Sequence, residues 1–61
     1  MELNIGTTYI FKMGFNAMLI RVDTPYGTTR YTFRLINGNE LVVFNPKIEI
    51  IGEKGKNEYD M

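Results

Sequence analysis

TTRYTFRLI, residues 28–36, is the stretch of sequence that decides the fold. Large apolar residues alternate with polar ones along it, so that Tyr31, Phe33 and Leu35 share one face while threonines and arginines share the other. A period of two in aromatic and branched residues is typical of a half-buried β-strand. We therefore expect a strand here, with its rings toward the core and its arginines toward solvent.

A second long strand is expected at residues 15–22, which precede this strand and are separated from it by DTPYG at 23–27. Proline and glycine in that segment indicate a turn. A hairpin that opposes Ile20 to Tyr31 and Met18 to Phe33 turns all four side chains inward and leaves Leu19 outward. A slip of one residue would exchange the two faces of the earlier strand.

Asn37-Gly38 separates residues 28–36 from the apolar run LVVF at 41–44. Asn-Gly between strands favours a two-residue type I′ turn. That turn opposes Val42 to Phe33 and places Val42 and Phe44 in the core. A loop of three or five residues would instead turn Leu41 and Val43 inward, and the sequence leaves this choice open.

The two ends of the chain are less regular. Residues 9–13 (YIFKM) predict a strand with Tyr9, Phe11 and Met13 inward, whereas Asn45-Pro46 interrupts the pattern and allows at most one helical turn. Residues 47–51 predict a last strand with Ile48 and Ile50 inward. The polar residues 52–61 predict a disordered tail, so that residues 1–51 form one domain.

Short strands, tight turns and no helical period predict an all-β fold. We expect a small antiparallel barrel or sandwich of five or six strands, SH3-like, because closure into a barrel would leave no exposed edges. A chain of 61 residues without cysteine must stabilise this fold by packing alone.

Several function classes lose support from composition. The chain has no His, Cys or Ser and no glycine-rich phosphate loop, so we expect neither an enzyme nor a cofactor or metal site. Its formal net charge is zero, which is unlike a typical nucleic-acid-binding domain. No signal peptide or membrane-spanning run is recognisable, and a cytoplasmic location is expected. The short, Ile- and Asn-rich sequence is compatible with a phage or mobile-element origin.

The candidate site is the outward face of the predicted central hairpin. Three arginines would lie there, with Arg21 directly opposed to Arg30, and such like-charge opposition suggests an anionic or acidic partner. The competing interpretation is that Glu40 or Glu49 neutralises them. The residues expected to bind a partner are Arg21, Arg30, Arg34, Tyr26 and Leu19.

These observations predict a non-enzymatic protein-binding module, such as a small regulator or inhibitor. The first alternative is a nucleic-acid-binding small β-barrel that uses the same arginines, and its binding would weaken steeply with salt. The second is a homo-oligomeric structural protein, because apolar residues left outside the core favour self-association, for example as a homodimer.

Overall fold

The computed structural model describes residues 3–55 and is all-β. Its five strands are β1 (Thr8–Phe11), β2 (Asn16–Asp23), β3 (Arg30–Leu35), β4 (Glu40–Val43) and β5 (Ile50–Gly55). Two short 3₁₀ turns interrupt the connections: η1 (Pro25–Gly27) between β2 and β3, and η2 (Pro46–Ile48) between β4 and β5. Each turn begins at a proline, whose fixed φ suits the first position of a helical turn.

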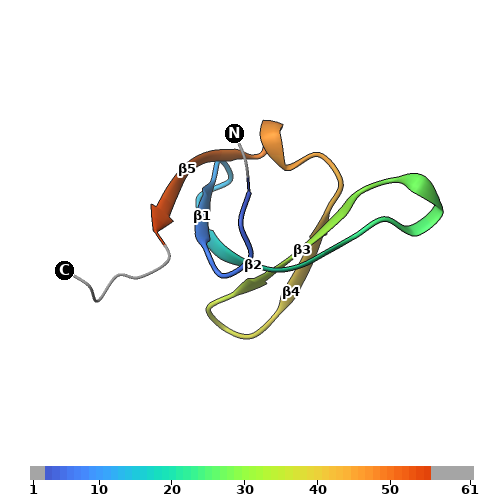
Figure 1. Cartoon of the computed structure of the whole chain (residues 1–61). Helices are drawn as coiled ribbons and strands as arrows, with labels where there is room; N and C mark the ends of the chain where they lie inside the picture. Colours follow the sequence, from blue (N-terminus) through green and yellow to red (C-terminus); the bar gives the residue numbers. More distant parts are fainter. Residues whose placement is uncertain (1–2, 56–61) are drawn as a thin grey trace.

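The strands form a single antiparallel sheet in the order β4-β3-β2-β1-β5 (Figure 1). The first and last strands are thus neighbours, while β4 and β5 form the two edges. Within residues 3–55 no ladder joins these edges, so the expected closed barrel or two-sheet sandwich is wrong. Strand β4 has only four residues. The chain turns away from the sheet at Asn45-Pro46, because proline has no N–H to donate to a strand ladder.

The core lies on one face of the curled sheet. Its fully buried rings are those of Tyr9, Phe11 and Phe33, which confirms the inward placement of these three aromatic residues. Half-buried Tyr31 and Leu35 pack against them, also on the predicted side. The buried apolar side chains are Tyr9, Phe11, Ala17, Leu19, Phe33 and Ile50.

Strand β2 contains an irregularity that exchanges its two faces. Near the η1 end, Val22 opposes Tyr31, but the register shifts between Leu19 and Arg21, and Leu19 then opposes Phe33. The extra residue is Ile20, so the strand behaves as one with a β-bulge. Leu19 is 0% exposed, and its predicted outward position is therefore wrong.

The β3–β4 hairpin has a three-residue loop in place of the two-residue turn that Asn-Gly favours. The Leu35 N–H donates to the Asn39 carbonyl at 2.8 Å, which leaves residues 36–38 as a three-residue loop. Gly38 completes it with φ +94°, a conformation that favours glycine. Leu41 consequently opposes Phe33, so the structure adopts the alternative in which Leu41 and Val43 face the core, a choice that the sequence left open.

The last connection also differs from the sequence-based expectation. Ile48 lies in η2 and is exposed, as is Met13 in the β1–β2 turn, so neither reaches the core as predicted. Ile50 is buried, as expected. Strand β5 continues to Gly55, and the predicted tail therefore begins too early at residue 52. The rest of that tail lies outside the described residues.

Candidate functional site

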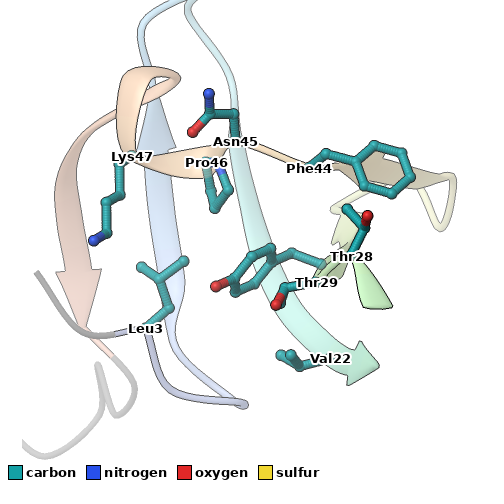
Figure 2. Close-up of a pocket in the computed structure, with 9 residues that line it drawn as sticks. Leu3, Val22, Thr28, Thr29, Phe44, Asn45, Pro46 and Lys47 are labelled. Atoms are coloured by element: carbon teal, nitrogen blue, oxygen red, sulfur yellow. The ribbon is translucent and has the colours of Figure 1, made fainter. Parts of the chain in front are cut away.

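A groove of about 580 Å³ lies where η2 faces the end of the β2–β3 hairpin (Figure 2). Leu3, Pro46 and Lys47 lie on one side of it in this view, and Phe44, Thr28 and Val22 on the other. We call this the η2 groove. Its lining residues are Leu3, Val22, Thr28, Thr29, Tyr31, Phe44, Asn45, Pro46 and Lys47.

The floor of the η2 groove is an extension of the core face. Val22 and Tyr31 oppose one another across β2 and β3, in the next row of core-facing residues after the row that contains the fully buried Phe33. This row is only partly covered, because the hairpin continues past the core and projects from the rest of the molecule (Figure 1). Apolar surface is thereby left accessible at the end of the sheet.

The η2 wall is held by main-chain hydrogen bonds of its own turn. The Glu49 N–H donates to the Pro46 carbonyl at 2.9 Å, and the Ile48 N–H donates to the Asn45 carbonyl at 3.3 Å. Pro46 is buried and anchors the turn, whereas its neighbours Asn45 and Lys47 are exposed. The η2 turn, anchored by Pro46, therefore holds the Asn45 amide and the Lys47 side chain at the rim of the groove.

The chemistry of the η2 groove is mixed. Two threonine hydroxyls, the Asn45 amide and backbone groups can form hydrogen bonds, while the ring of Phe44, 56% exposed, offers a large apolar surface. Lys47 is the only basic or acidic side chain among the lining residues. The groove thus combines apolar contact with a single positive charge.

A second hollow of about 540 Å³ lies on the other side of Phe44. Phe44 and Asn45 line both spaces, so this ring forms the ridge between them. The second hollow, here called the β4 hollow, is more apolar and adjoins the edge strand. It is lined by Phe11, Met13, Phe15, Leu41, Val42, Val43, Phe44, Asn45 and Glu49.

The predicted arginine face is largely neutralised. Arg30 opposes Asp23 in the ladder and forms a forked pair with it, from Nε to Oδ1 at 3.0 Å and from Nη2 to Oδ2 at 2.5 Å. This hydrogen-bonded guanidinium lowers the pKa of Asp23. At the other end of β3, Arg34 pairs with Glu40 at 3.3 Å. The expected direct opposition of Arg21 and Arg30 is wrong, because Arg21 opposes Thr32.

The five predicted binding residues do not form one site. Leu19 is buried and is unavailable to a partner. Tyr26 is fully exposed at the tip of η1, where it adopts φ +55°. Arg34 is four positions along β3 from Arg30, roughly 13 Å at the rise of an antiparallel strand. None of the five lines the η2 groove.

Sequence reasoning missed the residues of the η2 groove because it allowed one helical turn at Asn45-Pro46 without linking it to a site, and because the two-residue loop it favoured placed Phe44 in the core. One signal was available. An Asn-Pro pair directly after an apolar run, followed by another apolar segment, allows a short turn that carries its neighbours to the surface. That turn could have suggested an exposed Phe44 beside Lys47.

Within residues 3–55, no three acidic side chains gather where they could share a metal ion. None of the helical segments in this range is long and apolar enough to span a membrane.

Comparison with known proteins gave no match among family models, curated proteins or solved structures.

Proposed function

We propose that the protein is a non-enzymatic protein-binding module, a small regulator or inhibitor that holds an extended peptide segment of its partner in the η2 groove. The observation that carries this proposal is the accessible apolar surface that Val22 and Tyr31 on the floor and Phe44 on the ridge present beside Lys47. A groove lined by rings and a proline, with a few hydrogen-bonding groups, suits an extended peptide. An SH3-like arrangement of the fold is part of the proposal, supported by five short antiparallel strands whose first and last members pair.

The charge in the groove defines the chemistry of the partner. Lys47 lies at the rim without an acidic residue among the other lining residues. A partner segment with an aspartate or glutamate at this point would complement it, while an apolar side chain two or three positions away would reach Phe44. We therefore expect an extended, mildly acidic segment with at least one large apolar side chain.

Nucleic acid is the less supported partner. Two of the three arginines that would contact phosphate already pair with Asp23 and Glu40. The formal net charge of the chain is zero. Phosphate-dominated binding would need several free cations on one face.

The proposal is tested by selecting binders from a random peptide library displayed on phage, with the full chain immobilised. The affinity of the best peptide is then measured by calorimetry for the parent, Phe44→Ala and Lys47→Glu. We expect each substitution to weaken binding at least about tenfold, because it removes either the exposed ring or the complementary charge. Moderate salt should reduce the affinity only slightly.

Matched controls separate the groove from general surface effects. Ile36→Ala removes an exposed apolar side chain at the β3–β4 loop, and Lys12→Glu reverses an exposed lysine outside the groove. Both controls should bind like the parent. Equal losses in controls and groove variants would contradict the site, and a steep log-linear dependence on salt would favour the nucleic-acid alternative.

A further inference from the structure

The two edges of the sheet differ in how they are protected against pairing with another strand. Strand β5 pairs with β1 through two register shifts and carries Gly52, Glu53 and Lys54, all features that discourage a further partner. Strand β4 pairs with β3 in one continuous register and has Glu40 as its only charge. Within the described residues, β3 is the only strand paired with β4. The β4 edge is therefore open and regular.

The direction of the free backbone groups follows from the hairpin. The Leu35–Asn39 hydrogen bond fixes the phase of the ladder, and hydrogen-bonded pairs alternate with non-hydrogen-bonded pairs in antiparallel strands. Leu41 and Val43 thus bond toward β3. The N–H and C=O groups of Glu40 and Val42 point outward, along the free edge.

Apolar surface adjoins this edge on both sides of the sheet. Val42 is 48% exposed on the outer face. On the core face, half-buried Leu41 and Val43 border the β4 hollow together with Phe11 and Phe15. A strand added at the edge would satisfy the free backbone groups and extend the apolar surface on both faces.

We propose that this strand is β4 of a second copy, paired antiparallel about a two-fold axis that passes beside Val42. In this register Val42 faces Val42 of the second copy, and its outward N–H and C=O form the central hydrogen-bonded pair. Leu41 faces Val43 of the second copy, so the two β4 hollows adjoin. The sheet becomes one continuous ten-stranded sheet.

Charge and sequence favour this occupant over an unrelated strand. The register places Glu40 opposite Phe44 of the second copy and away from the other Glu40, while Glu40 keeps Arg34 as its partner within its own chain. A chain with zero formal net charge also has no overall repulsion between copies. Leu41 and Val43, which border the β4 hollow in one copy, meet the same two residues of the second copy on the same face of the joined sheet.

The first test is the mass of the full chain by analytical ultracentrifugation from micromolar to millimolar concentration. We expect it to rise from 7.1 kDa to twice that value. Hydrogen exchange should show the Val42 amide becoming more protected as the dimer forms, whereas the Leu41 and Val43 amides are protected throughout. A mass that stays at 7.1 kDa over the whole range would overturn the proposal.

Two substitutions at one position locate the interface. Val42→Pro removes the outward N–H without removing a bond to β3, and Val42→Lys places a charge at the two-fold axis. Either should leave a folded monomer, with Val42→Lys deciding the matter if the proline variant unfolds. Ile51→Lys, at an exposed apolar residue of the other edge strand, is the matched control and should still dimerise. A dimer that survives Val42→Lys, or one that Ile51→Lys abolishes, would contradict this interface.

Discussion

The ring of Phe33 meets the ring of Phe11 edge-on, with centroids 5.0 Å apart and planes at 89°. The two residues belong to β3 and β1, which are separated in the sheet by β2. Their contact therefore shows that the sheet curls enough to bring non-adjacent strands together over Leu19. Phe33 also meets Tyr9 edge-on at 6.2 Å, so this one ring of β3 contacts both buried rings of β1.

Phe33→Ala should reduce the free energy of unfolding by about 3–5 kcal/mol, because it removes a fully buried ring and leaves a cavity. A loss of that size is comparable to the whole stability of a domain this small. Thermal and urea unfolding followed by circular dichroism would measure it. The matched change Phe44→Ala, at a half-exposed ring, should cost less than about 1 kcal/mol. Equal losses would show that the two rings are not buried differently.

The sequence predicted which face of β3 is buried but not which face of β2. Tyr31, Phe33 and Leu35 alternate with polar residues, so only one face of β3 can be buried without burying its arginines. In β2, Met18-Leu19-Ile20 is apolar throughout, and either face can be buried at similar cost. The bulge at Ile20 then places Leu19 in the core, because one unpaired residue exchanges the inward and outward faces of β2 beyond it. Alternation cannot reveal a bulge inside a continuous apolar run.

Thr32→Val should raise the free energy of unfolding by about 1 kcal/mol. Thr32 is buried in the row between Arg21 and Val42, and its Oγ1 has no hydrogen-bond partner among the described residues. Burial of an unpaired hydroxyl is unfavourable, and valine has almost the same shape. Urea unfolding would measure the change. A less stable variant would show that the hydroxyl has a hydrogen-bond partner.

Gly38→Ala should lower stability by about 1–2 kcal/mol through backbone strain alone. Gly38 has φ +94°, and a Cβ there would meet no atom within 4 Å. The loss would therefore report conformation and not a clash. Asn37→Ala is a second variant in the same loop, where the Asn37 Oδ1 accepts from the Asn39 N–H at 3.0 Å in an exposed setting. It should cost less than Gly38→Ala, and the reverse order would contradict the three-residue loop.

The Asp23–Arg30 pair should make stability depend on pH in the acid range. The pKa of Asp23 in the folded chain lies below its ordinary value of 3.8, mainly because Arg30 donates hydrogen bonds to the carboxylate. The pair therefore stabilises the fold fully above that ordinary value, and its contribution is lost as the pH falls through the lowered one. Chemical unfolding of the parent and Asp23→Asn from neutral to strongly acid pH should give curves that converge on acidification. Curves that stay parallel would show that the pair contributes nothing.

The site was harder to predict than the fold. The arginines were placed on the outer face correctly by alternation, since Arg21, Arg30 and Arg34 all occupy that face in the ladder. Their neutralisation depended on which acidic residue lay opposite each arginine. The β2–β3 register beside η1 differs by two residues from the expected one and so places Asp23, not Arg21, opposite Arg30. The η2 groove depends on how a non-repetitive turn at Pro46 meets a hairpin end distant in sequence. Local patterns carry no information about that meeting.

The most direct test of the groove as a peptide-binding site is a chemical-shift titration of the ¹⁵N-labelled chain with the peptide selected on it. We expect the largest shifts at the amides of Val22, Thr28, Tyr31, Phe44 and Lys47, with little change at Ile36 and Lys12. Shifts confined to the arginine face or to the tip of η1, with the η2 groove unchanged, would contradict the account.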